Sequence, residues 1–328
     1  MKRSQTLVAA VALAATSLPL VAQQRAAVGE AVPDTTFPEF LNGDGRQKLS
    51  EFYGQPVVID QWGTHCPPCV GTAVPNAIRH DHAHGEDGLV TILVESQGSN
   101  PAQLEHFLWE RFPDNECFSC IGTFVPIPES AGIPFCGVIG VDGKLVWAGN
   151  PAAFPKDVED AVEAELDKVR KGWGDSSDAR KVRAALYGKG DFERAAATVA
   201  AMADGAEKTA LQGEIEKRYA VKKNAIDVLR KAGRWVDAQD AAAALAKGVG
   251  KHETWATEAA ELLAAFETDA AKAEIALDKK LDKILKTMRK GKLDRAPKDL
   301  EKLVERAGQS TVAPRASRMI AALAATNN

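Results

Sequence analysis

The stretch WGTHCPPCV, residues 62–70, holds two cysteines three positions apart with two prolines between them. It follows the apolar run PVVIDQW (Pro56–Trp62), which is typical of a buried strand. Proline fits the first turn of a helix, because the backbone N–H groups there have no partner within the helix. The stretch therefore predicts a strand-to-helix turn with Cys66 at the helix N-terminus and Cys69 one turn inside it.

This placement predicts the chemistry of the two thiols. The helix dipole and the free N–H groups of the first turn favour a negative charge on the sulfur of Cys66. Thiol pKa values at such positions fall from about 8.5 to roughly 3.5–7.5. Cys69 lies close enough to close a disulfide, so the pair combines an attacking thiol with a resolving thiol. The two prolines fix the turn, so that both redox states share one backbone.

Length and composition set the wider expectations. The 328 residues are 45% hydrophobic and 26% charged, which is ordinary for a soluble chain with room for two domains. A formal net charge of −4 gives no reason to expect a nucleic-acid partner. Residues 1–22 combine Lys2 and Arg3 with a short apolar run and predict a secretory signal, with an uncleaved anchor as the alternative. We therefore expect an exported, periplasmic protein.

The chain changes character near residue 155. Before it, the run LVTILV (Leu89–Val94) predicts a second buried strand, and PAQLEHFLWERF (Pro101–Phe112) predicts a helix opened by proline. The segment FCGVIGVDGKLVWAG (Phe135–Gly149) predicts a hairpin that turns at Asp142–Gly143. We therefore expect an α/β domain over residues 23–170.

Residues 171–328 are rich in Ala, Leu, Lys and Glu and predict an all-α domain. Three segments, which start at Gly190, Gly233 and Gly291, share an apolar residue at +2 and Ala at +5. The pattern resembles the helical hairpins of tetratricopeptide-type repeats, in which small residues let helices approach closely. This repeat-like domain carries no catalytic constellation, and its expected partner is another protein.

Three segments together resemble a known family. The segment VVIDQWGTHCPPC is similar to the active-site segment of thioredoxin-fold oxidoreductases, above all the exported TlpA/ResA type. Residues 28–59 resemble the N-terminal extension of that group, and GIPF (Gly132–Phe135) resembles the segment that carries the cis-proline of the fold. The likeness covers residues 28–168. It implies a central mixed sheet flanked by helices, no organic cofactor, protein thiols or disulfides as substrates, and a membrane redox partner that resets the dithiol.

The resemblance also assigns roles to single residues. Asp60 matches the buried acid that exchanges a proton with Cys69, and burial beside thiols raises the pKa of such a carboxyl. The alternative for Asp60 is a structural strand-end residue satisfied by backbone donors. Trp62 matches the aromatic residue under the active-site loop, while Ile133 and Pro134 match the positions that receive the partner chain. 

Two positions depart from the family pattern. His65 stands where an aromatic or apolar residue usually precedes the first cysteine, and an imidazolium there would further stabilise the Cys66 thiolate. Pro75 lies one residue further along the helix than usual, which shifts the expected kink.

Three further cysteines leave alternatives open. Cys117 and Cys120 are a possible second thiol pair, either a local structural disulfide or a redox couple that exchanges electrons with Cys66–Cys69. The same four cysteines are also enough for a zinc site, although the strand-to-helix context of the first pair favours redox chemistry. Cys136 is expected to be an inert buried thiol.

Histidines and rival functions complete the expectations. His80, His82 and His84 lie within five residues, and the first and last would share a helical face able to bind a transition metal; a polar helix end is the simpler interpretation. A peroxiredoxin-like peroxidase is one rival, although Gly63 occupies the position of that family's threonine. A redox-dead adaptor whose helical half binds partners is the other.

Overall fold

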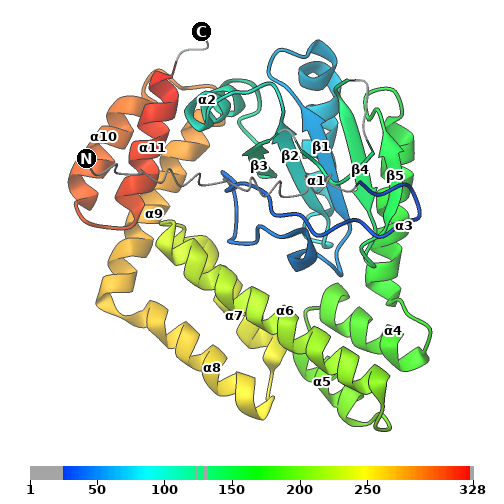
Figure 1. The fold of residues 1–328 in the computed structure, drawn as a ribbon. Helices are drawn as coiled ribbons and strands as arrows, with labels where there is room; N and C mark the ends of the chain where they lie inside the picture. Colours follow the sequence, from blue (N-terminus) through cyan, green and yellow to red (C-terminus); the bar gives the residue numbers. More distant parts are fainter. Residues whose placement is uncertain (1–24, 123, 129–131, 326–328) are drawn as a thin grey trace, which may run out of the picture.

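The computed structural model describes residues 25–122, 124–128 and 132–325, so the expected signal segment lies outside the described residues. A five-stranded mixed sheet forms the N-terminal region, in the order β3-β2-β1-β4-β5 (Figure 1). Strands β1, β2 and β3 are parallel, and β4 is antiparallel to both of its neighbours. The strands are β1 (Val57–Trp62), β2 (Val90–Glu95), β3 (Phe118–Ile121), β4 (Phe135–Ile139) and β5 (Leu145–Gly149). Both predicted strands and the predicted hairpin are confirmed.

The two faces of the sheet are covered differently. Helices α1 (Val74–His84) and α3 (Pro155–Lys171) pack on one face, and α2 (Pro101–Arg111) lies at the β3 edge. The other face is covered by the segment before β1, whose buried aromatic residues contact the strands: Phe37, Phe40 and Phe52. Because β1 is covered on both faces, its residues are apolar apart from Asp60 and Gln61.

The C-terminal region is all-α, as predicted. Its helices are α4 (Ser177–Arg183), α5 (Phe192–Ala200), α6 (Ala206–Lys231), α7 (Trp235–Val249), α8 (Glu253–Ala264), α9 (Asp269–Met288), α10 (Ala296–Ala307) and α11 (Val312–Ala324). Helix α4 packs on α5, α6 on α7, α9 on α10, and α10 on α11. Helix α8 lies between the second and third of these pairs, which explains why the sequence pattern recurs at unequal intervals.

The small residues of the recurring segments lie where helices meet. The glycines that open the three segments all have a positive φ: Gly190, Gly233 and Gly291. The alanine five positions further on is 0% exposed at Ala195 and Ala238 and 3% exposed at Ala296. These alanines therefore set the close approach of neighbouring helices, whereas kinship to tetratricopeptide repeats stays a prediction.

This packing gives a stability prediction. Replacing Ala238 with leucine adds methylenes to a filled interface and is expected to lower the free energy of unfolding by about 1–3 kcal/mol. Ala243→Leu, on the exposed side of α7, is the matched control and should change it by less than about 0.5 kcal/mol. Urea unfolding followed by circular dichroism measures both, and equal effects at the two positions would contradict the interpretation.

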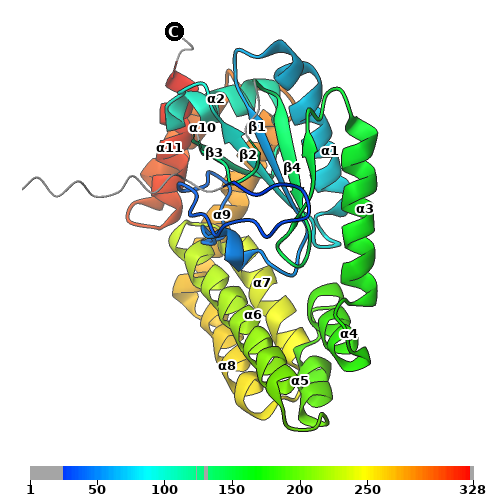
Figure 2. The same ribbon diagram turned by 45° about the vertical axis from the view of Figure 1, so that its right-hand side comes forward.

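The helical region meets the sheet domain at the end where the chain enters β1. Lys217 of α6 donates to the carbonyl of Ser50 over 3.2 Å, and Tyr187 packs against Gly54, where a Cβ would overlap its ring. Helix α11 packs on α2 at the sheet edge. Figures 1 and 2 show α4 to α8 below the sheet and the turn that follows β1 at the opposite, upper end.

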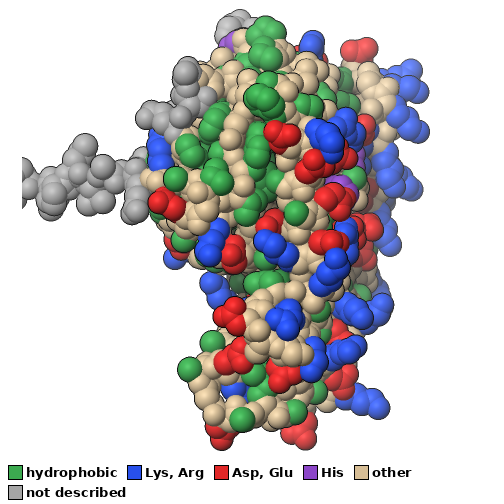
Figure 3. Space-filling view, turned by 90° about the vertical axis from the view of Figure 1, so that its right-hand side faces the viewer, with side chains coloured by type: hydrophobic (Ala, Val, Ile, Leu, Met, Phe, Trp, Pro, Cys, Tyr) green, Lys and Arg blue, Asp and Glu red, His purple; other side chains and the backbone are tan. Residues whose placement is uncertain are grey.

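The surface carries both signs of charge. On the face seen in Figure 3, acidic and basic side chains are interspersed, which agrees with the small net charge of −4. Across the described ranges of the chain, none of the helices combines the length and the apolar character that crossing a bilayer requires.

Candidate functional site

Cys66 and Cys69 form a disulfide in the turn after β1. Their Cα atoms are 5.2 Å apart, and the side chains are buried, with Cys66 6% and Cys69 0% exposed. The Cys66 carbonyl accepts the first helical hydrogen bond from the amide of Val70, which makes Cys66 the residue that caps the helix. The amide of Cys69 donates to Sγ of Cys66 over 3.3 Å. A first-turn N–H group thus already points at the sulfur that would carry the negative charge.

The helix that carries Cys69 starts with an irregular turn. Residues Cys69–Ala73 form a π-helical turn, which continues directly into α1. Pro75 lies in the first turn of α1, and a proline ring crowds the carbonyl four residues before it. A wider turn ahead of Pro75 relieves that crowding and accounts for the shifted position of this proline.

Pro134 lies beside the disulfide. The Ile133–Pro134 peptide bond is cis, and the Ile133 carbonyl oxygen is 3.6 Å from Sγ of Cys66. The structure therefore brings both residues to the sulfur that is the less buried of the pair. The role of Ile133 and Pro134 in receiving a partner chain stays a prediction.

Asp60 is buried in the middle of β1. It is 1% exposed and pairs in register with Cys136 on β4 and Leu93 on β2. Its Oδ1 atom has no hydrogen-bond partner among the residues that the structure describes. Burial raises the pKa of this carboxyl to about 8, as the sequence led us to expect. An acid that titrates near neutral pH can either give or take a proton, which is what exchange at a dithiol needs.

Aromatic residues and one glutamine support the turn. Trp62 is fully buried and packs against Phe107 and Phe112, with ring centroids 5.9 and 6.3 Å away. The exposed His65 donates its backbone N–H to Oε1 of Gln97 over 2.7 Å. Gln97 was not singled out in the sequence, because it follows β2 and reaches the turn only through the fold.

The possible second thiol pair does not form. Cys117 and Cys120 are free and buried, and they belong to separate hydrophobic clusters on opposite faces of the sheet. Cys117 packs in the cluster that contains Trp62, whereas Cys120 packs in the cluster that covers the other face. Both expectations for this pair, a local disulfide and a redox couple, are corrected.

Counting thiols tests this correction. Alkylation of the oxidised protein under denaturing, non-reducing conditions should modify three cysteines, Cys117, Cys120 and Cys136, and five after reduction. Mass spectrometry of the intact chain measures both numbers. A single modified cysteine in the non-reduced sample would show that a second disulfide exists.

The remaining candidates lie apart from one another. Cys136 is free and buried, and burial together with Asp60 raises its pKa well above the usual range. Nε2 of His82 contacts the Asp114 carbonyl at 2.9 Å, while His84 lies 3.4 Å from Glu163. No group of three or more His, Cys, Asp or Glu side chains suited to a metal ion occurs in the described part of the chain.

Comparison with known proteins gives the following matches. No curated protein sequence matches the chain. Among solved structures, thiol:disulfide interchange protein DsbE from Chlorobium tepidum is 22% identical, with a TM-score of 0.37, over 43% of this chain and 99% of that chain. A thiol-disulfide isomerase from Corynebacterium glutamicum is 18% identical, with a TM-score of 0.34, over 41% of this chain and 96% of that chain. The model of the Redoxin family matches residues 27–115, which contain β1 and both cysteines of the disulfide. The sequence match is therefore confined to the N-terminal region, and each of these two solved structures likewise covers less than half of the chain.

Proposed function

We propose that the protein is an exported thiol–disulfide oxidoreductase that exchanges disulfides with other proteins through Cys66 and Cys69. One observation carries the proposal. The Cys66–Cys69 disulfide lies at the start of a helix, and the carbonyl oxygen of Ile133, in the cis Ile133–Pro134 bond, lies 3.6 Å from Sγ of Cys66. A buried acid, Asp60, lies on the preceding strand. 

In the reducing direction the reaction has two steps. The Cys66 thiolate attacks one sulfur of a partner disulfide, forms a mixed disulfide and releases the other partner sulfur as a thiolate. Cys69 then gives its proton to the Asp60 carboxylate, and its thiolate attacks Sγ of Cys66. The second partner sulfur leaves, the partner has gained two electrons, and the Cys66–Cys69 disulfide is formed. The same steps in reverse oxidise a partner dithiol.

The assignment of the two sulfurs follows from their environments. Cys66 is the attacking group because it caps the helix, accepts the amide of Cys69 and is the more exposed sulfur. Cys69 is the resolving group because it is fully buried and reaches Cys66 but not a folded partner. Asp60 supports both directions of exchange, since its pKa of about 8 keeps both protonation states accessible near neutral pH.

Location and partners are part of the proposal. Residues 1–22 have the pattern of a secretory signal, which would deliver the chain to the periplasm. Disulfides persist in that compartment, so the pair needs a redox partner that resets it after each turnover, and a membrane protein is the expected one. The helical region is proposed to bind a protein, and no organic cofactor is required.

A trapping experiment tests the proposed function. Cys69→Ser removes the resolving sulfur, so the mixed disulfide between Cys66 and a partner should accumulate when the variant is expressed in the exported compartment. Gel electrophoresis without reductant should show adducts that dithiothreitol removes, and their identity gives the substrates. The double variant Cys66→Ser/Cys69→Ser is the control and should form none. Adducts formed equally by both variants would overturn the proposal.

The two rival functions make different predictions for the wild-type protein. A redox-dead adaptor would not reduce the disulfides of insulin, and a peroxidase would consume hydrogen peroxide rapidly. We expect insulin reduction with negligible peroxide turnover, because Gly63 replaces the threonine that the peroxidase would need. Coupled assays with the same reductant measure both activities.

A further inference from the structure

A polar cavity lies between the sheet domain and the helical region. Its volume is about 880 Å³, and its lining combines residues from the segment before β1 with residues of α6 and the last helices. At one end are Asp44, Arg46 and Gln55 from the sheet domain and Lys222 from α6. Gly45, with φ of 93°, lets the segment pass against Val228 of α6, so the two regions approach each other closely beside the cavity.

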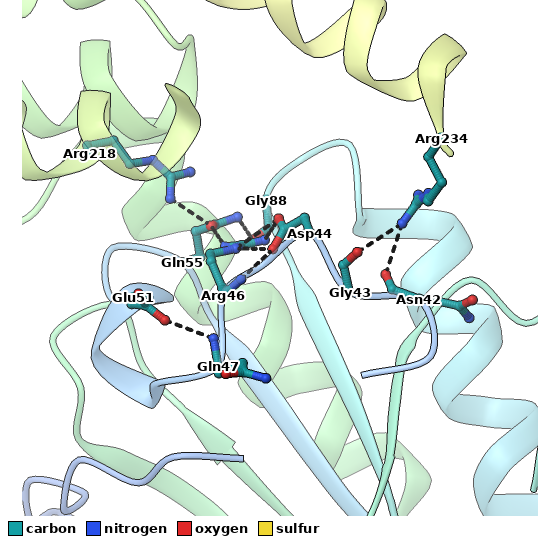
Figure 4. A network of polar contacts seen from close by, with 10 residues as sticks. All are labelled: Asn42, Gly43, Asp44, Arg46, Gln47, Glu51, Gln55, Gly88, Arg218 and Arg234. Carbon is teal, nitrogen blue, oxygen red and sulfur yellow. Dashed lines mark hydrogen bonds and ion pairs between the residues drawn. The ribbon is translucent and has the colours of Figure 1, made fainter. Parts of the chain in front are cut away.

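Two guanidinium groups from different regions of the chain share one neutral acceptor there (Figure 4). Arg46 and Arg218 each donate to Oε1 of Gln55, over 2.9 and 3.0 Å. The orientation of Gln55 is fixed, because its Nε2 donates to the Gly88 carbonyl over 2.9 Å. Arg218 is only 7% exposed and carries five N–H donors, of which the shared amide oxygen takes one.

Positive charge is in excess at this end of the cavity. Asp44 pairs with Arg46 at 2.8 Å. Arg218 has no carboxylate within ion-pair distance among the residues that the structure describes. Lys222 follows Arg218 by one helical turn and keeps water-accessible surface in the cavity. Three cations therefore face one carboxylate.

The titration of these groups reflects that excess. The charge of Arg218, then burial and the charge of Arg46, lower the pKa of Lys222 to about 7. Burial, and then the charge of Arg46, lower the pKa of Arg218 to about 10. Burial raises the pKa of Asp44, but the charge and hydrogen bonds of Arg46 and the charge of Lys222 outweigh it and leave this pKa below the usual value.

We propose that this end of the cavity binds a small tetrahedral oxyanion of the phosphate or sulfate type, held by Lys222 together with Arg46 and Arg218. The charge of the buried Arg218 is costly unless it is neutralised, and an anion here would neutralise it together with the charge of Lys222, which is exposed to the cavity. Several oxygen atoms on one ligand match the unused guanidinium and ammonium donors. Because Arg46 belongs to the sheet domain and Arg218 to α6, the bound anion would also hold the two regions together.

Calorimetric titration of the full-length oxidised protein tests the site. Sodium phosphate and sodium sulfate are each added at an ionic strength matched with sodium chloride. Both oxyanions should bind saturably at one site, and chloride should not. Lys222→Met should weaken the binding of both oxyanions by at least about tenfold, because it removes one charge-assisted hydrogen bond. It should not lower the melting temperature of the anion-free protein. Lys231→Met, at the exposed end of the same helix, is the matched control and should bind as the wild type does.

A second variant gives a change in the opposite direction. Asp44→Asn removes the one carboxylate that competes for the cations, so phosphate and sulfate should bind several-fold more tightly. A misfolded protein cannot produce tighter binding. The proposal is overturned if wild-type binding is not saturable, if Lys222→Met and Lys231→Met bind equally well, or if Asp44→Asn binds more weakly than the wild type.

Discussion

Disulfide exchange by the Cys66→Ser variant is expected to be at least about 10³-fold slower than by the wild-type protein, the scale on which loss of a covalent nucleophile acts. A serine hydroxyl is not ionised near neutral pH and cannot form the mixed disulfide through which exchange proceeds. The remaining thiol, Cys69, is fully buried and does not replace it, because a folded partner cannot reach its sulfur. Insulin reduction at neutral pH, followed by turbidity with excess reductant, measures the rate.

Cys120→Ala is the matched control for this loss. It removes a cysteine that is also buried and belongs to the same sheet, but that packs on the face opposite the Cys117 and Trp62 cluster. Its rate should stay within a factor of about two of the wild type after correction for the folded fraction, since cavity formation affects stability and not the exchange step. If Cys120→Ala were as inactive as Cys66→Ser, the dithiol could not be assigned as the reacting group.

Asp60→Asn should give the second largest loss, about 10²-fold in the exchange rate near neutral pH, which is the lower end of the range for general acid–base catalysis. The amide keeps the size of the side chain but neither gives nor takes a proton. The wild-type rate should also depend on pH with a midpoint near 8, the pKa to which burial raises Asp60, and that dependence should vanish in the variant. Asp142→Asn, in the exposed turn between β4 and β5, should leave the profile unchanged.

The same variant has an effect on stability with a defined sign. Burial raises the folded-state pKa of Asp60 from 3.8 to about 8, so between these values the folded protein holds a proton that the unfolded chain has released. Stability therefore falls as pH rises from about 4 to about 8 and levels off above it. Asp60→Asn removes this cost, and at pH 7 it should be more stable than the wild type by on the order of 4 kcal/mol. If the difference in stability between Asp60→Asn and the wild type were the same at pH 8 as at pH 4, the buried-acid assignment would be contradicted.

The dithiol site could be predicted because its chemistry is local in sequence. The two prolines between the cysteines predict where the helix starts, and the apolar run before them predicts β1. Asp60 is recognisable because it is a carboxylate inside that apolar run. Pro134 needed the family resemblance, because nothing in the residues alone brings a segment so far along the chain to the sulfur of Cys66.

Other features depend on the tertiary arrangement and were missed or misjudged. The spacing of Cys117 and Cys120 suggests a pair, but Cys117 precedes the short strand β3 and packs on one face of the sheet, whereas Cys120 lies in β3 and packs on the other. Gln55 and Arg218 meet although they are separated by 163 positions, and no periodic pattern links a glutamine before β1 to an arginine in the middle of α6. Such contacts follow from how two regions pack and not from local propensity.

The placement of the helical region at the entry end of β1 separates two poles of the molecule. Gln55 precedes this six-residue strand and Cys66 follows it, which places roughly 20 Å of rigid backbone between them at about 3.3 Å per residue. A ternary complex is therefore sterically allowed, with one macromolecule at the sulfur pole and another on the helices. Two routes connect the ends, the strand β1 and the contact of α11 with α2, whose Phe107 packs on Trp62, so the two binding events are additive unless one of these routes shifts.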